Sequence, residues 1–196
     1  LVTGPNGGGK STLVAVLARQ LEIAQGQYLV DGVDVRRLPL EEVRGLAAVV
    51  DDEPHVFATS LRENLRLALP AAGRDPAGEP ASGTDGLLVD ALRQAGLEAW
   101  LNGLPSGLDT RLGTGGRGVS GGERARLSIA RAVLSGRPVL LLDEAVAHLD
   151  HATADAVLGD LLRTDDGRLP QTIVIVSHAP VEGRHVDVVV ELAPPG

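Results

Sequence analysis

The sequence predicts an α/β fold with a mostly parallel sheet and an inserted α-helical subdomain. A short apolar stretch runs into the glycine-rich residues 4–12 and then into a helical apolar pattern, which is the order strand, loop, helix. Uninterrupted apolar runs at residues 139–142 and 172–176 are typical of strands that are covered on both faces. Strands that alternate with helical patterns indicate a parallel sheet, whereas residues 61–136 read mainly as helices.

Capping residues and periodicity place the individual elements. Ser60 and Glu63 have the spacing of a capping box, which predicts a helix over residues 61–69. Gly96 and Gly136 are expected to end two further helices, because glycine readily adopts the left-handed conformation that follows a helix. The remaining predictions are strands at 27–30, 46–50, 139–142, 172–176 and 186–192, helices ending near 22 and covering 88–95, 123–135 and 153–162, and a mobile loop at 70–86.

Composition restricts the class of function. The 196-residue chain has a formal net charge of −8, which argues against a general nucleic-acid or anionic-membrane surface. It has no cysteine, so disulfides, thiol catalysis and cysteine-based zinc sites are excluded. No apolar run is long enough to cross a bilayer. The chain also has no methionine and reaches its glycine loop almost at once, which predicts a piece of a longer protein with a truncated N-terminus.

The segment GPNGGGKST fits the phosphate-loop pattern G-x-x-x-x-G-K-[ST] at Gly4, Gly9, Lys10 and Ser11. Glycines let successive backbone N–H groups point into one concavity, and the helix that follows adds the positive end of its dipole. A polyphosphate is expected there, with Lys10 on the outer phosphates and the Ser11 hydroxyl on Mg²⁺. Lys10 is also the only lysine in the chain. The alternative is a plain glycine-rich turn.

Two carboxylates follow the apolar run at residues 139–142. Asp143 and Glu144 are therefore expected at the carboxyl edge of a parallel sheet, where ligands of such folds bind. Asp143 suits the outer coordination sphere of Mg²⁺, and Glu144 suits a general base that orients water for attack on a γ-phosphate. The alternative is an ordinary acidic turn after a strand.

Two further segments are candidates for contacts with an anion. His178 follows the second apolar run and is expected at the same edge, where it would hold the γ-phosphate or the attacking water; the alternative is a histidine that caps backbone groups. The segment VSGGE, residues 119–123, opens a predicted helix. Ser120, Gly121 and Gly122 at that helix N-terminus form either an anion site or a plain N-cap.

In this order the motifs resemble those of the ATP-binding cassette (ABC) family. GPNGGGKST matches the Walker A motif of the family and VLLLDE its Walker B motif. VSGGE is similar to the signature LSGGQ, with Val119 in place of leucine and Glu123 in place of glutamine. Residues 147–150 resemble the D-loop, and His178 resembles the switch histidine. The resemblance covers essentially the whole chain.

The resemblance implies a RecA-like P-loop NTPase core made of residues 1–60 and 137–196, with a helical subdomain at 61–136 that ends in the signature helix. It implies an ATPase that uses Mg²⁺ and pairs with a second ATPase subunit, so that each ATP lies between one Walker A and the other signature. The nucleotide-binding residues that it implies are Gly4, Pro5, Asn6, Gly7, Gly8, Gly9, Lys10, Ser11, Thr12, Ser120, Gly121, Gly122 and Asp150. The catalytic residues that it implies are Lys10, Glu144 and His178, and the metal-binding residues are Ser11, Asp52 and Asp143.

The type of transporter is also suggested by resemblance. Residues 55–65 and 113–123 are similar to exporters, whose ATPase is joined to a transmembrane domain and lies on the cytoplasmic face of the cell membrane. Residues 147–155, AHLDHATAD, are similar to the thiol-reductant (cysteine/glutathione) exporter subunit of cytochrome bd assembly, which implies a heterodimer and no nucleic-acid partner. By the same resemblance Phe57 docks a transmembrane coupling helix; the alternative is a core aromatic residue.

The sequence departs from the family at Asp52, where a glutamine that touches Mg²⁺ and the attacking water is expected. A carboxylate still binds Mg²⁺ through oxygen, but it donates no hydrogen bond. Together with the altered signature, this leaves open a regulatory nucleotide-binding half that hydrolyses little ATP itself. The adenine-stacking aromatic of the family precedes its Walker A strand and is absent from this sequence. A third class, soluble cassettes of DNA repair or translation, is disfavoured by the acidic charge.

Overall fold

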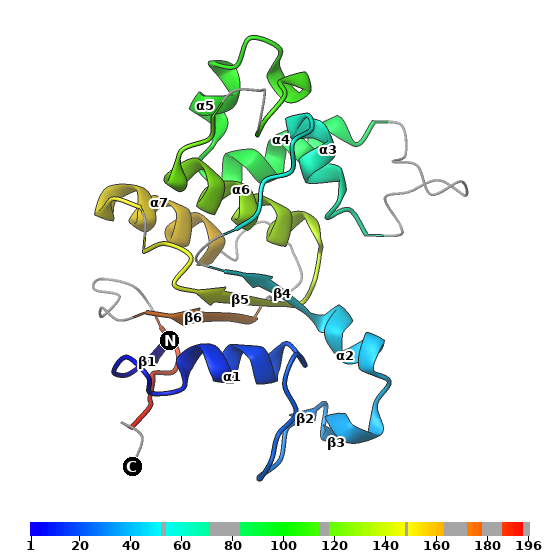
Figure 1. Cartoon of the computed structure of the whole chain (residues 1–196), viewed down its shortest axis with the longest axis vertical. Helices are drawn as coiled ribbons and strands as arrows, with labels where there is room; N and C mark the ends of the chain where they lie inside the picture. The colour runs from blue at the N-terminus through cyan, green and yellow to red at the C-terminus, as the bar shows by residue number, and fades with distance from the viewer. Residues whose placement is uncertain are drawn as a thin grey trace. The chain divides into compact units, whose positions relative to one another are not determined.

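The computed structural model describes residues 1–51, 54–70, 83–113, 118–147, 149–162, 172–177 and 186–193. The chain divides into two compact units (Figure 1). The first contains residues 1–49, 137–144 and 169–196, and the second contains residues 50–136 and 145–168. The predicted boundaries at 60/61 and 136/137 stay a prediction; residues 145–168, which were assigned to the core, are grouped here with the helices.

A five-stranded sheet in the order β4-β5-β6-β1-β7 organises the first unit. Strand β1 pairs in parallel with β6 and β7, and β5 pairs in parallel with β6. The strands are β1 (Val2–Thr3), β4 (Ala47–Val50), β5 (Val139–Asp143), β6 (Thr172–Val176) and β7 (Val190–Glu191). A small antiparallel pair is formed by β2 (Leu29–Val30) and β3 (Val33–Asp34), followed by the short 3-10 helix η1 (Val35–Arg37) and helix α2 (Leu40–Leu46).

Helix α1 (Lys10–Leu17) packs against the sheet through its apolar face. Val14 and Ala18 contribute to a buried cluster with Val2, Leu141 and Val176. This packing fixes the start of α1 next to the end of β1. The phosphate loop therefore connects two elements that are anchored by the same core.

The second unit is helical. Its elements are α3 (Leu61–Arg66), α4 (Asp85–Gln94), α5 (Glu98–Asn102), the 3-10 helix η3 (Gly107–Asp109), α6 (Gly121–Leu134) and α7 (His151–Leu162). Helix α6 buries a stripe that includes Leu127, Ile129 and Ala130, and α4 buries Leu88 and Leu92 completely. No helix among the described residues is both long enough and apolar enough to span a bilayer.

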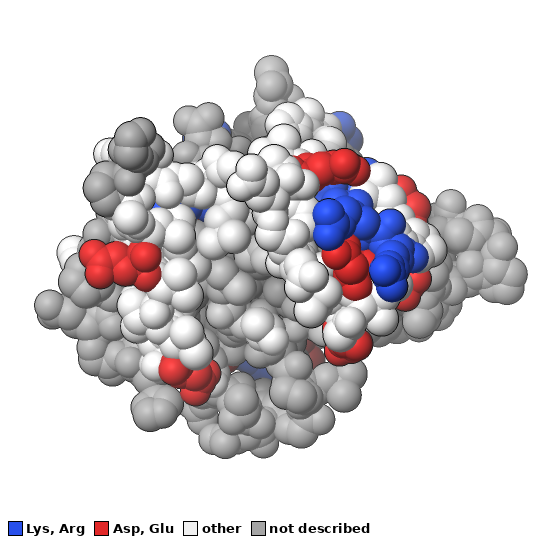
Figure 2. All heavy atoms as spheres, turned by 90° about the horizontal axis from the view of Figure 1, so that it is seen from below, with Lys and Arg blue, Asp and Glu red and all other residues white. Residues whose placement is uncertain are grey.

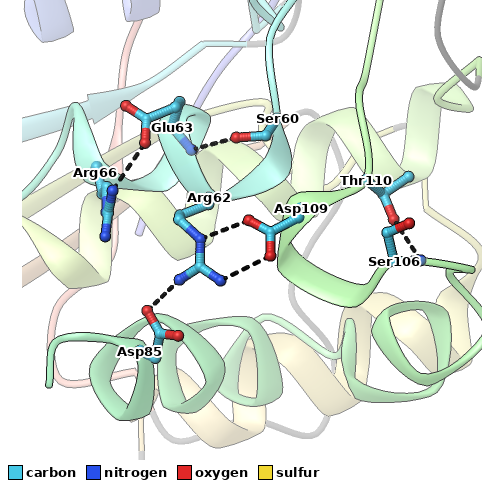
Figure 3. Close-up of polar contacts among 8 residues, drawn as sticks. All are labelled: Ser60, Arg62, Glu63, Arg66, Asp85, Ser106, Asp109 and Thr110. Carbon is cyan, nitrogen blue, oxygen red and sulfur yellow. Dashed lines mark hydrogen bonds and ion pairs between the residues drawn. The ribbon is translucent and has the colours of Figure 1, made fainter.

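Arg62 joins three elements of this unit (Figure 3). From α3 its Nε donates to Asp109 of η3 at 2.8 Å, and its Nη1 pairs with Asp85 of α4. The hydrogen bond from Arg62 lowers the pKa of the Asp109 carboxyl, and the two carboxylates raise the pKa of the guanidinium. One side chain thus ties η3 and α4 to α3.

This cluster leads to a prediction on pH dependence. Because the pKa of Asp109 is depressed in the folded chain, its contribution to stability is present above the unfolded pKa of about 3.9 and is lost as the pH falls through the lower folded value. Arg62→Met should return the Asp109 pKa to its ordinary range and remove this contribution, as NMR titration of the carboxyl would show. Arg93→Met, which breaks an exposed pair with Asp90 within α4, is the control. An unchanged titration of Asp109 would contradict the prediction.

Several sequence predictions are confirmed. Strands β4, β5 and β6 lie within about one residue of their predicted bounds, and Gly96 and Gly136 adopt φ of 67° and 62° after α4 and α6. The predicted mobile loop at 70–86 lies mostly outside the described residues, and α4 already begins at Asp85.

Several boundaries differ from prediction. Helix α1 ends at Leu17 rather than near residue 22, because Arg19 takes a left-handed φ of 54° and its N–H and that of Gln20 bond back to Val16 and Ala15. Helix α3 likewise ends at Arg66. The last strand is only Val190–Glu191, shorter than the predicted 186–192, and lies at the edge of the sheet with Val188 to Val190 exposed.

Candidate nucleotide-binding site

The carboxyl ends of three parallel strands are level with one another. Val176 of β6 pairs with Val2 of β1 on one side and with Asp143 of β5 on the other. Because neighbouring strands lie about 4.8 Å apart, the Cα atoms of Val2 and Asp143 are separated by roughly 10 Å. The phosphate loop, the Asp143–Glu144 pair and Ser177 therefore all leave one edge of the sheet. His178 comes next after Ser177, but it and Asp52 lie outside the described residues.

Lys10 is held inside the phosphate loop. Its side chain begins α1 and only 5% of the residue is exposed. Its Nζ donates to the carbonyl oxygens of Gly4 and Pro5, both at 3.0 Å. An ammonium group has three donors, so one remains for a further acceptor. Gly9 makes this geometry possible, because as N-cap of α1 it adopts a left-handed φ of 85°.

Gly4 makes a tight backbone contact that leads to a prediction. Its φ is +148°, and a Cβ there would lie 2.8 Å from the carbonyl oxygen of Leu192. Gly4→Ala should push the loop away from Leu192 and lower ATP affinity roughly tenfold or more, since overpacking costs about 1–3 kcal/mol. Titration calorimetry with ATP measures this. Gly26→Ala is the control, because Gly26 also has a positive φ but has open space around it. Equal ATP affinity in the Gly4 variant and the parent chain would contradict the prediction.

Asp143 has the property expected of a cation ligand. Its Oδ1 is buried, and no hydrogen-bond partner is found for it among the described residues. A buried acceptor left unsatisfied costs about 1–3 kcal/mol, so a group that satisfies it in the working protein is expected. Carboxylate and hydroxyl oxygens suit Mg²⁺, and Ser11 is an exposed residue in the first turn of α1. The residues present therefore fit Mg²⁺.

Glu144 has an unusual backbone conformation. Its φ is 52°, in the left-handed region that side chains rarely adopt, and such a conformation costs about 1–2 kcal/mol. A hydrogen bond from its N–H to the Val176 carbonyl, at 3.2 Å, holds it in place. Strain of this kind is found preferentially at functional sites. Sequence reasoning selected Glu144 for its carboxylate, and no local pattern indicated its backbone.

The signature residues lie at the N-terminus of α6 in the second unit. Ser120 and Glu123 form a reciprocal capping box: Glu123 N–H donates to Ser120 Oγ at 3.2 Å, and Ser120 N–H donates to Glu123 Oε2 at 2.8 Å. The hydroxyl proton of Ser120 is not used by this pair. The S-x-x-E spacing would have identified the box from sequence.

The D-loop residue Asp150 is engaged as a helix cap. Its carboxylate accepts hydrogen bonds from the backbone N–H of Thr153 at 3.0 Å and from the Thr153 hydroxyl at 2.7 Å. These bonds lower the pKa of the Asp150 carboxyl. Within the same unit, a Cβ at Gly122 would lie 3.3 Å from a methyl carbon of Leu149, so the D-loop packs against the signature.

Phe57 is 46% exposed, so its interpretation as a core aromatic residue is wrong. Its ring meets His55 edge to face, with centroids 4.7 Å apart, and the Arg131 guanidinium lies 5.6 Å from its centroid. Docking of a coupling helix at Phe57 stays a prediction.

Comparison with known proteins decides the family. Residues 1–147 match the family model described as "ABC transporter". The chain belongs to the ABC transporter family. Within this family the matched region is the ATP-binding domain, and the homologous domains are ATPases coupled to transport. The predicted P-loop NTPase fold with its mostly parallel sheet is confirmed.

Individual relatives support the assignment of this domain to the ABC transporter family. It is 41% identical over 186 residues to "Mycobactin import ATP-binding/permease protein IrtB" of Mycolicibacterium thermoresistibile, covering 95% of this chain and 30% of the relative. It is 37% identical to "Uncharacterized ABC transporter ATP-binding protein YwjA" of Bacillus subtilis, covering 89% of this chain and 28% of that protein.

A solved structure, "Structure of a bacterial Atm1-family ABC exporter with ATP bound", superimposes with a TM-score of 0.81 at 27% identity. It covers 97% of this chain and 31% of the other. The chain thus spans about three tenths of the length of these relatives. The exporter-type resemblance of the ATPase domain is confirmed; the resemblance to the thiol-reductant exporter subunit stays a prediction.

Proposed function

We propose that this chain hydrolyses ATP to power the movement of a substrate across the cytoplasmic membrane. The observation that carries the proposal is that parallel strands end side by side at one edge of the sheet. The segments that leave this edge carry the buried Lys10, the unsatisfied Asp143 oxygen and the strained Glu144. The names of the relatives support it. Purified full-length protein should hydrolyse ATP only when Mg²⁺ is present, and an absence of hydrolysis with saturating Mg·ATP would overturn the proposal.

Each residue has a distinct task in this proposal. Lys10 uses its remaining donor on the outer phosphates, and the N–H groups of the phosphate loop bind the same phosphates. Ser11, Asp52 and Asp143 would hold Mg²⁺, which neutralises charge on the β- and γ-phosphates when bound. Glu144 accepts the proton of the attacking water, and His178 holds the γ-phosphate in position.

A second ATPase subunit completes the proposed site. Ser120, Gly121 and Gly122 would contact a nucleotide held mainly by the partner, and Asp150 would lie at the same interface. The Ser120 hydroxyl keeps its proton for such an acceptor. We place the assembly on the cytoplasmic face of the membrane with a joined transmembrane domain, in keeping with the words "ATP-binding/permease" in the name of the relative IrtB.

Two further parts of the proposal are the transported substrate and the question of which subunit hydrolyses ATP. A thiol substrate of the cysteine or glutathione type rests only on the resemblance of residues 147–155, and the names of the relatives given above do not mention a thiol. The regulatory-half alternative rests on Asp52 and Glu123. Mutating Glu144 and its counterpart in the partner one at a time distinguishes an active ATPase from a regulatory half. If only the partner mutation stops turnover, this chain is the regulatory half.

A nucleic-acid function is not favoured by the surface. On the face seen in Figure 2, basic atoms gather in one cluster that has acidic atoms within and around it. Among the described residues, Arg36 is exposed and paired with Asp34. A continuous basic stripe, which phosphate backbones require, is not visible on that face.

A further inference from the structure

Arg131 fastens the segment before α3 to helix α6. Its Nε donates to the carbonyl oxygen of Asn64 at 2.8 Å, and its Nη1 donates to the carbonyl oxygen of His55 at 2.6 Å. Its Nη2 donates to the side-chain oxygen of Asn64. One guanidinium therefore binds both ends of residues 55–64.

Asn64 completes this attachment through its own hydrogen bonds to the segment. It is fully buried; its Oδ1 accepts the Phe57 N–H at 3.0 Å, and its Nδ2 donates to the carbonyls of Phe57 and Ser60 at 3.0 and 2.9 Å. The segment that presents the exposed Phe57 ring is thus held by Asn64, and Asn64 is held by Arg131. Any displacement of α6 at Arg131 must be followed by this segment or break these bonds.

Stability alone does not explain an arginine here. All of its hydrogen-bond acceptors are neutral, no described carboxylate forms an ion pair with it, and burial lowers the pKa of its guanidinium. Removing a cation from water without a counter-charge is costly. Arg62, by contrast, is paired with two carboxylates. In return for that cost Arg131 gains three directional bonds, one to the His55 carbonyl before α3 and two to Asn64 of α3.

We propose that Arg131 is a positioning residue that makes residues 55–60 and helix α6 move as one body. Helix α6 carries the nucleotide-contacting Ser120 of the proposed function, on which this inference rests, about 16 Å along its axis from Arg131. A change at the signature is thereby transmitted to the exposed surface at His55 and Phe57.

Hydrogen exchange of residues 55–60 tests this in full-length protein. We expect the slowly hydrolysed analogue ATP-γ-S with Mg²⁺ to slow exchange of this segment about fivefold or more in the parent protein. In Arg131→Met the ratio of the exchange rate without nucleotide to the exchange rate with nucleotide should fall to within twofold of one. Nucleotide affinity should stay unchanged. A merely structural role would raise exchange equally in both states and leave the ratio intact, and that result would overturn the inference.

Arg93→Met is the matched control. It makes the same chemical change in the same unit, but Arg93 forms an exposed pair with Asp90 within α4, and the nucleotide-dependent ratio should persist. If Arg131→Met does not fold, Arg131→Lys replaces it, because a compact ammonium group lacks the fork that reaches all three acceptors; a full ratio in that variant contradicts the inference. Parent protein that binds no nucleotide refutes the proposed function, whereas parent protein that hydrolyses ATP with a ratio of one refutes only the inference.

Discussion

Glu144→Gln should reduce ATP turnover by about 10²- to 10⁴-fold, the usual contribution of a general base, while nucleotide stays bound. The amide has the size of the carboxylate but cannot accept the proton of the attacking water. The backbone at this position, with φ of 52°, is fixed by the bond to Val176 and is expected to stay as it is. The loss therefore falls on the chemical step and not on binding.

Single-turnover kinetics and size-exclusion chromatography of the full-length protein measure this effect. The variant should retain ATP and remain as a nucleotide-bound dimer, because hydrolysis no longer resets the site. Glu41→Gln, an exposed change in the first turn of α2, is the control and should turn over ATP normally. Undiminished hydrolysis in Glu144→Gln would remove Glu144 as the base.

Lys10→Met should lower ATP affinity by about 10²-fold or more, since removing one partner of a buried charge pair costs about 2–5 kcal/mol. The loop also loses the two bonds that Lys10 makes to the Gly4 and Pro5 carbonyls. Lys10→Arg is expected to fail as well. The buried position suits a compact ammonium group, and a planar guanidinium does not reproduce its contacts.

Equilibrium titration with ATP measures the loss, and thermal unfolding without nucleotide reports the change in the loop itself. Arg37→Met removes an exposed cation from the first unit and serves as the control for net charge. If Lys10→Met bound ATP as tightly as the parent, the phosphates would have to lie elsewhere.

Sequence predicted those parts of the molecule whose cause is local. The apolar runs of β5 and β6 and the glycines after α4 and α6 have near-neighbour signatures, and the fold followed from them. The predicted end of α1 was wrong because Arg19 adopts the left-handed conformation that glycine usually provides at the end of a helix. The edge position of β7 depends on which strands surround it, and the sequence of one strand does not contain that information.

The chemical groups of the candidate site were predictable from the sequence, but the contacts between distant segments around it were not. Lys10, Asp143 and Glu144 were selected by residue type and spacing, and the sheet brings the segments that carry them to one edge. The attachment of Asn64 by Arg131 joins residues 67 positions apart and has no periodic signature. Such contacts between distant segments become visible only when the elements are packed together.

A crystal structure of the chain with Mg²⁺ and a non-hydrolysable ATP analogue tests the central claim most directly. It should place a phosphate oxygen within hydrogen-bonding distance of Lys10 Nζ and the metal on the Ser11 hydroxyl, with Asp143 Oδ1 bonded to the metal or to one of its waters. Triphosphate bound away from this sheet edge, or Asp143 Oδ1 still unsatisfied beside bound Mg²⁺, would contradict it.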